Sequence, residues 1–237
     1  MEKVITIKDY TGVHKELILR VINRDYFEAQ GADFSKIVHK DILDLTAVAY
    51  IGEVSENETH LNPVTLRMCE DWGKTPEEVY EEAFYNSALV NPINFNRVAD
   101  FIYETGVKEA EKRGDIEMAA HFEDLANEFE ETGNEEKIII SAIPGLGTSY
   151  FLANPEMQKA LSETLGGKSY YISPLSTDEL IVSPRELTEE EKIIEILSIA
   201  GTNVTSLKVL KRPEVILSGN LYFYNAVEHK LEIAMEV

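Results

Sequence analysis

The segment that most restricts the fold is a run of apolar residues at positions 44–51 (DLTAVAYI). It has the length of a strand and lacks the alternation of a strand with one face in water, which is typical of a strand buried on both faces. Residues 17–23 (LILRVIN) are apolar and β-branched enough to form a second strand. Residues 4–7 (VITI) alternate in the manner of a third, short strand.

Signals for helix boundaries follow in the next part of the chain. The pair Asn62-Pro63 resembles a helix start, with asparagine as the N-cap and proline at the first helical position. It predicts a helix that ends at Gly73, where a left-handed residue is favoured. Thr75-Pro76, followed by two glutamates, predicts the start of a second helix. A short helix is also expected at residues 25–30.

Two helices joined by a glycine turn suggest a DNA-reading helix-turn-helix as an alternative. The second of these helices carries four glutamates and no lysine or arginine over residues 76–86. A phosphate backbone repels a helix of this charge. We therefore expect the pair to be a structural helical hairpin.

Residues 104–136 form the most polar region of the sequence. They hold twelve acidic and three basic side chains and so contribute −9 to the net charge of −21. Apolar residues still recur at helical spacing between positions 107 and 130, which predicts two ordered helices broken near Gly114. We expect an acidic helical protrusion here, and we place the boundary between two halves of the chain in it.

Strands dominate the remainder of the sequence. The expected elements are a pair of strands at 137–143 and 149–153, a helix at 155–165 capped by Asn154, strands at 169–173 and 179–183, a helix at 188–199 and a hairpin at 220–225 and 230–234. The whole pattern predicts an α+β fold: two mixed α/β halves with short β-sheets packed by helices, joined by an acidic helical segment. The predicted boundaries are 1–103 for the N-terminal half, 104–136 for the acidic helical insertion and 137–237 for the C-terminal half.

The charge balance restricts the partners of the chain. It has 22 basic and 43 acidic residues, a formal net charge of −21. Nucleic-acid affinity comes largely from lysine and arginine, and anionic membranes also attract basic segments, so neither direct nucleic-acid nor membrane binding is expected. A basic protein is the electrostatically favoured partner. The simpler interpretation is that the acidity serves solubility alone.

Cysteine usage and the N-terminus predict a cytoplasmic protein, from a bacterium or from something that infects one. The single cysteine, Cys69, cannot form an internal disulfide, which fits a reducing compartment. The first residues lack the basic start and apolar run of a signal peptide. No apolar stretch approaches the roughly 20 residues that cross a bilayer.

No catalytic residue, cofactor site or metal site is predicted. The loop at 144–149 (PGLGTS) lacks the lysine of a phosphate-binding loop, and we interpret it as a turn between strands. The five histidines are scattered without metal-ligand spacing, and Cys69 lies on an apolar helix face as a small hydrophobe. The loop at 173–179 (SPLSTDE) has hydroxyls beside acids and is normally a hydrogen-bonded turn. It is also the first place to look for a small-molecule site.

Several segments occur in a familiar order: 19–23 (LRVIN), 41–50 (DILDLTAVAY), 62–86, 147–184 with LGG, SYYISP and DELIVSP, and the closing VLS, NLYFYN and HKLEI. In this order the chain resembles a family of uncharacterised proteins of gut Firmicutes, itself distantly similar to the YtpQ-like proteins. The resemblance covers most of the chain. It implies a shared fold and, because no function is established for that family, no mechanism.

The leading hypothesis is a non-enzymatic interaction protein whose acidic surface binds a basic protein. In its sharper form, the protein is an inhibitor from a phage or mobile element that presents carboxylates in place of nucleic-acid phosphates. The candidate binding residues are Glu123, Asp124, Glu128, Glu130 and Glu131.

Two alternatives belong to other classes. One is an enzyme of unknown class with a site that reading motifs does not detect, in which a divalent ion is held by an acidic pair such as Asp41/Asp44 or Asp178/Glu179. The other is homodimerisation through exposed aromatic residues of the C-terminal hairpin, Tyr222, Phe223 and Tyr224.

Overall fold

The apolar run at 44–51 forms the central strand of the first sheet, β3 (Leu45–Val54). Its antiparallel partners are β1 (Leu17–Ile22) on one side and β2 (His39–Ile42) and β4 (Thr59–Pro63) on the other. Ala47, Val48 and Ala49 are fully buried, which confirms the prediction of a strand covered on both faces.

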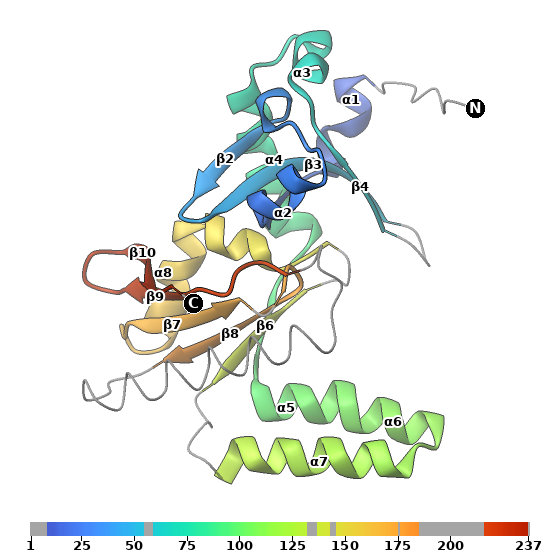
Figure 1. The fold of residues 1–237 in the computed structure, drawn as a ribbon, viewed down its shortest axis with the longest axis vertical. Coiled ribbons are helices and arrows are strands. Elements are labelled where there is room, and N and C mark those ends of the chain that lie inside the picture. The colour runs from blue at the N-terminus through green and yellow to red at the C-terminus, as the bar shows by residue number, and fades with distance from the viewer. Residues whose placement is uncertain are drawn as a thin grey trace.

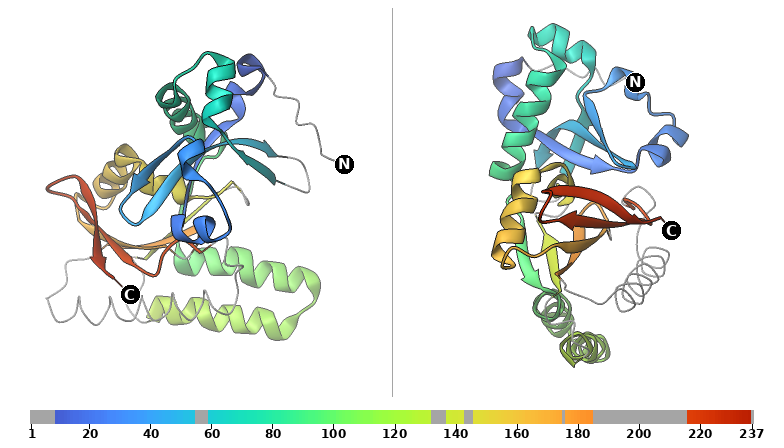
Figure 2. Two further views of the ribbon diagram at one scale, coloured as in Figure 1. Left: turned by 45° about the horizontal axis from the view of Figure 1, so that its top comes forward. Right: turned by 90° about the vertical axis from the view of Figure 1, so that its left-hand side faces the viewer.

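Figures 1 and 2 show three parts in sequence along the longest axis: the first sheet with its helices, a second sheet, and a helical hairpin at the far end. The computed structural model describes residues 9–54, 59–131, 137–142, 146–174, 176–184 and 216–236. The predicted strand at 4–7 and the predicted helix at 188–199 lie outside these ranges. The α+β class with short sheets packed by helices is confirmed.

Short helices surround the first sheet, and α4 (Pro76–Val90) packs against β1. The others are α1 (Tyr10–Val13), η1 (His14–Glu16), α2 (Arg24–Ala29), η2 (Phe34–Lys36) and α3 (Leu66–Trp72). The predicted start of α4 is confirmed by a capping box in which Thr75 accepts from the Glu78 amide at 3.2 Å and Glu78 accepts from the Thr75 amide at 2.8 Å.

The helix start predicted at Asn62-Pro63 is wrong. Both residues end β4, where they pair with Ile51 and Tyr50 of β3. Proline is tolerated there because an edge strand need not donate every backbone N–H group. The N-cap of α3 is Thr65, whose hydroxyl accepts from the Met68 amide at 3.2 Å. The predicted end is confirmed, with Gly73 in the left-handed conformation at φ 65°.

The polar region forms a hairpin of helices, which we call the acidic hairpin (residues 98–131). Its first arm is one continuous run of α5 (Val98–Ile102), the π-helical turn η3 (Tyr103–Val107) and α6 (Lys108–Arg113). Its second arm is α7 (Ile116–Glu131). The break predicted near Gly114 is confirmed, since this glycine has φ 73° and ends α6. The acidic hairpin projects from the body of the molecule (Figure 1).

The second sheet is antiparallel throughout and has the order β10-β9-β7-β8-β6-β5. Its strands are β5 (Asn94–Arg97), β6 (Ile138–Ser141), β7 (Tyr170–Pro174), β8 (Glu179–Pro184), β9 (Leu221–Asn225) and β10 (Lys230–Met235). The helix α8 (Pro155–Thr164) begins at Asn154, as predicted. The sheet includes β5, which precedes the acidic hairpin in sequence, and the proposed halves remain a prediction.

The strand predicted at 149–153 is wrong, because these residues form a 3₁₀ helix, η4 (Ser149–Ala153). The first four of its five residues are fully or nearly fully buried. The segment lies against β1 of the first sheet, where the Ser149 hydroxyl accepts from the Val21 amide at 3.0 Å and donates to the Val21 carbonyl at 2.8 Å. An apolar segment enclosed on all sides gives the same continuous pattern as a buried strand.

One buried apolar cluster connects the two sheets. It contains Leu19 and Ala49 from the first sheet and Ile140, Tyr170 and Tyr222 from the second. The acidic hairpin has a separate small cluster, formed by Val107, Ala110, Ala119 and Phe122. Among the described residues, no helix is both long and apolar enough to cross a membrane.

Candidate functional site

The five predicted binding residues all lie on α7, in the outer arm of the acidic hairpin. Glu123 and Asp124 are exposed, and the side chains of the other three lie outside the description. α7 carries six acidic residues and no lysine or arginine: Glu117, Glu123, Asp124, Glu128, Glu130 and Glu131. The structure therefore brings the predicted residues together on a single helix, while their role stays a prediction.

The two lysines of the acidic hairpin form salt bridges within its first arm. Lys108 donates to Glu104 at 2.6 Å, and Lys112 donates to Glu109 at 2.6 Å. The hydrogen bond from Lys112 lowers the pKa of Glu109, an exposed carboxylate. Within the described ranges, no salt bridge reaches Glu117, Glu123 or Asp124. These three carboxylates of α7 are therefore not paired with a cation of the described part of the chain.

Two apolar side chains at the turn of the acidic hairpin are exposed to solvent. Ile116 is 81% exposed and Met118 is 45% exposed, both in the first turn of α7. Single exposed apolar residues are common, and these two lie on the same helix as the exposed carboxylates Glu123 and Asp124.

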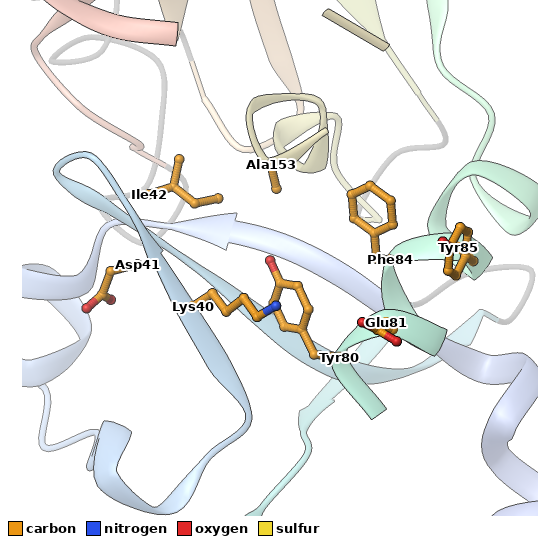
Figure 3. Close-up of a pocket in the computed structure, with 8 residues that line it drawn as sticks. All are labelled: Lys40, Asp41, Ile42, Tyr80, Glu81, Phe84, Tyr85 and Ala153. Atoms are coloured by element: carbon orange, nitrogen blue, oxygen red, sulfur yellow. The ribbon is translucent and has the colours of Figure 1, made fainter. Parts of the chain in front are cut away.

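A second feature is an open pocket of about 380 Å³ bordered by β2, α4 and η4, which we call the aromatic pocket (Figure 3). Its apolar wall is formed by Ile42, Tyr80, Phe84 and Ala153. Lys40, Asp41, Glu81 and Tyr85 complete the lining. These residues are far apart in the sequence, which is why motif reading missed them. The sequence signal that could have indicated this pocket is the alternation of acidic and aromatic residues at 77–85 (EEVYEEAFY).

The polar groups of the aromatic pocket differ in how they are engaged. Lys40 Nζ donates to Glu77 at 2.6 Å and lies 4.4 Å from the centroid of the Tyr80 ring. Burial, with a smaller effect of Glu77, raises the pKa of Tyr80 to about 12, so this phenol stays protonated at neutral pH and is a poor general base. Glu81, by contrast, forms no salt bridge with any residue that the structure describes.

Asp41 at the rim of the aromatic pocket is held by neighbours. It accepts from Thr46 at 2.8 Å and from Arg24 at 2.9 Å. The hydrogen bond from Thr46 lowers the pKa of this carboxyl most; burial opposes it, and the Arg24 guanidinium adds to the lowering, so that the pKa stays below its usual value. Asp41 is thus a structural anion.

A second pocket, of about 340 Å³, is bounded by β5, β6 and α8. Its lining is mostly apolar, with Phe95, Met157 and Leu161 among its residues. Its guanidinium group, Arg97, lies 3.7 Å from Asp100. The geometry provides no reactive group in this pocket.

The loop at 173–179, the first place to look for a small-molecule site, meets the glycine loop at 144–149, which the sequence predicts to be a turn. The amides of Thr148 and Ser149 donate to the Thr177 carbonyl at 2.8 and 3.1 Å. These backbone N–H groups are aimed at protein, so this part of the glycine loop does not form a phosphate cradle. Arg20 of β1 bonds the Thr177 hydroxyl and lies 3.5 Å from Asp178. The two loops thus hold each other and bond β1 where the two sheets meet.

The acidic pairs suggested for a metal ion do not assemble a ligand cluster. Asp44 accepts from Ser218 at 2.6 Å, Asn220 at 2.9 Å and Tyr222 at 2.7 Å. Asp178 faces Arg20 instead. Across the described residues, no group of three or more histidine, cysteine, aspartate or glutamate side chains is placed to hold a metal ion.

Of the three aromatic residues predicted to be exposed at the C-terminal hairpin, two are buried and the third, Phe223, is half-buried against Tyr171 and Leu221. Tyr222 is 1% exposed and Tyr224 is fully buried, because β9 is an inner strand of the second sheet. Tyr222 donates to Asp44, and Tyr224 is paired with His229 at 3.2 Å. Cys69 is also buried, and burial raises the pKa of its thiol, as expected for a packing residue.

A family model described as a family of unknown function, DUF5688, matches residues 1–226. Searches of the curated proteins and of the solved structures found no match.

Proposed function

The chain belongs to the family of unknown function DUF5688, and from its own surfaces we propose that it is a non-enzymatic interaction protein whose acidic hairpin binds a basic protein. The observation that carries this proposal is α7, a helix with six acidic residues and no lysine or arginine. A helix of this kind attracts a basic surface and speeds its association.

The position of the acidic hairpin supports the same proposal. It extends from the end of the molecule opposite α3, where α7 is accessible to a large partner (Figure 1). The exposed Ile116 and Met118 add apolar contact to the charge. In its sharper form, the proposal is an inhibitor of the kind that phages and mobile elements encode, which occupies the nucleic-acid site of its partner with carboxylates in place of phosphates.

Charge reversal on α7 tests the proposal. The variant replaces Glu123, Asp124, Glu128, Glu130 and Glu131 with lysine. We expect its affinity for a fluorescein-labelled oligoarginine peptide of about ten residues to fall at least about tenfold, measured by fluorescence anisotropy at physiological salt. The native chain should also show a steep loss of affinity with added salt, and the variant a shallow one.

A charge-matched control separates a defined surface from overall acidity. It carries lysine at five acidic positions outside the acidic hairpin: Glu70, Asp71, Glu228, Glu232 and Glu236. At physiological salt, charges farther away than about 8 Å are screened, so this control should bind nearly as the native chain does. Equal losses in the two variants would contradict a role for α7.

The inhibitor form of the proposal is tested by competition between the native chain and duplex DNA for a DNA-binding protein.

A further inference from the structure

The wall of the aromatic pocket repeats one arrangement of side chains along α4. Glu77 precedes Tyr80 by three residues, and Glu81 precedes Phe84 by the same spacing and Tyr85 by four. Side chains three and four residues apart lie on the same face of a helix. A carboxylate beside an aromatic ring therefore occurs twice, one turn apart.

A cation of the chain itself occupies the first of these two arrangements. The ammonium group of Lys40 lies 4.4 Å from the centroid of the Tyr80 ring and donates to Glu77 at 2.6 Å. An aromatic face together with a carboxylate is the combination that attracts a cation by both its charge and the quadrupole of the ring. The molecule thus shows how this pair of groups holds a cation.

The second arrangement has the same groups and lacks the cation. Among the described residues, none forms a salt bridge with Glu81. Tyr85 is 69% exposed and meets Phe84 edge to face, with 5.6 Å between the ring centroids. Figure 3 shows Phe84 pointing toward Ala153 of η4 and Ile42 of β2, with Glu81 and Tyr85 next to it on α4, on the side away from Ile42.

We propose that the second arrangement binds an arginine side chain of the basic partner, so the source of the arginine rests on the proposed function. The volume of about 380 Å³ admits such a side chain, whose apolar stem would contact Ile42 and Phe84. The planar guanidinium group stacks on an aromatic ring and bonds a carboxylate at the same time, as Tyr85 and Glu81 require. An anionic ligand would instead face Glu81 and Asp41.

Titration of the full chain with N-acetyl-arginine amide, followed by NMR, tests this site. We expect saturable shifts at residues of α4 and η4, and none from N-acetyl-citrulline amide, which has nearly the same shape without the charge. Glu81→Gln should weaken the binding about threefold to fivefold, and Tyr85→Leu about twofold to fivefold, as exposed ion pairs and cation–π contacts imply.

Glu82→Gln is the matched control, because it makes the same change of charge at the next residue of α4, which does not line the pocket. It should bind the arginine derivative as the native chain does. Binding of citrulline with equal affinity, or equal weakening by Glu81→Gln and Glu82→Gln, would overturn the inference.

The test also separates this inference from the proposed function. The charge-reversed acidic hairpin should bind the arginine derivative with unchanged affinity, since none of its substitutions is at a residue that lines the aromatic pocket. If the arginine derivative does not bind to the aromatic pocket, the inference is wrong, even if the acidic hairpin still binds oligoarginine.

Discussion

Four tyrosines, Tyr150, Tyr170, Tyr222 and Tyr224, lie in the apolar core with exposures of 1% or less. Burial of a phenol is tolerated when its hydroxyl has a partner. Tyr150 donates to the Asn91 carbonyl at 2.8 Å, and Tyr170 to the Gln158 carbonyl at 2.9 Å. The sequence shows a tyrosine-rich C-terminus but not these partners, which lie up to 178 residues away in the case of Tyr222 and Asp44. Composition alone therefore could not distinguish exposed from buried aromatic side chains.

These buried phenols should make the fold unstable at alkaline pH. Burial raises the pKa of Tyr80 and of Tyr150 to about 12 each, and raises the pKa values of Tyr170 and Tyr222 as well. The unfolded chain releases these protons near pH 10 and the folded chain holds them to higher pH. The stabilisation is therefore complete below pH 10 and is lost as the pH rises from there toward 12. Each tyrosine removes up to about 1.4 kcal/mol per pH unit in this interval.

Urea titrations between about pH 8 and 11 measure this loss. Tyr80→Phe should make the fall in the free energy of unfolding shallower by about one proton per molecule. A free energy that stays constant over the whole range would show that the buried tyrosines do not hold their protons.

Elements whose signals are local were predictable from the sequence. The caps of α4 and α8 are examples, because Thr75 and Asn154 bond amides only three residues away. The carboxylates of α7 were predictable for the same reason, since one periodic helix carries them all. η4 and the aromatic pocket were not, because the burial of η4 against β1 and the lining of the pocket by β2 depend on segments that are distant in sequence. β4 was missed for another reason: Asn62-Pro63 carries the local signal of a helix start, and pairing with the neighbouring strand β3 overrides it.

The acidic hairpin should depend on the absence of a side chain at Gly106. A Cβ atom at this residue would lie 2.7 Å from Cγ of Phe122, which is too close for any real contact. We expect Gly106→Ala to cost about 1–3 kcal/mol as strain between the two arms. Because the acidic hairpin has its own small cluster, the change should appear as faster amide hydrogen exchange in α7, with little effect on β3.

A double-mutant cycle with Phe122→Ala identifies the cause. The alanine at 122 removes the atoms with which the new Cβ collides, so Gly106→Ala should cost less in that background. Gly114→Ala is the comparison without a collision, since a Cβ there meets no atom within 4 Å and only the backbone at φ 73° is strained. Additive effects of the two substitutions at 106 and 122 would contradict the steric explanation.

At the scale of the whole molecule, the two sheets are joined through polar contacts around β1 as well as through the shared core. Arg20 of β1 meets Thr177 and Asp178, Asn23 donates to the Leu217 carbonyl at 2.9 Å, and Ser149 bonds Val21. A sheet edge with unpaired backbone groups is normally a liability. Here hydroxyl groups of η4 and α4 form hydrogen bonds with backbone groups of β1, so this edge of the first sheet lies inside the molecule.

Ser149→Ala tests whether the sheets unfold as one unit. The substitution removes both bonds to Val21, leaving a buried amide and a buried carbonyl without their partner, at a cost of about 2–4 kcal/mol. Because one core cluster spans both sheets, the loss should lower the stability of both equally.

Fluorescence of the single tryptophan, Trp72, reports on the first sheet, and near-ultraviolet circular dichroism of the buried tyrosines reports on the second. Their urea transitions should coincide in the native chain and shift together in the variant. Ser35→Ala, at an exposed serine, should leave both almost unchanged. Two separate transitions, with only the tyrosine signal shifted, would mean that the junction does not couple the sheets.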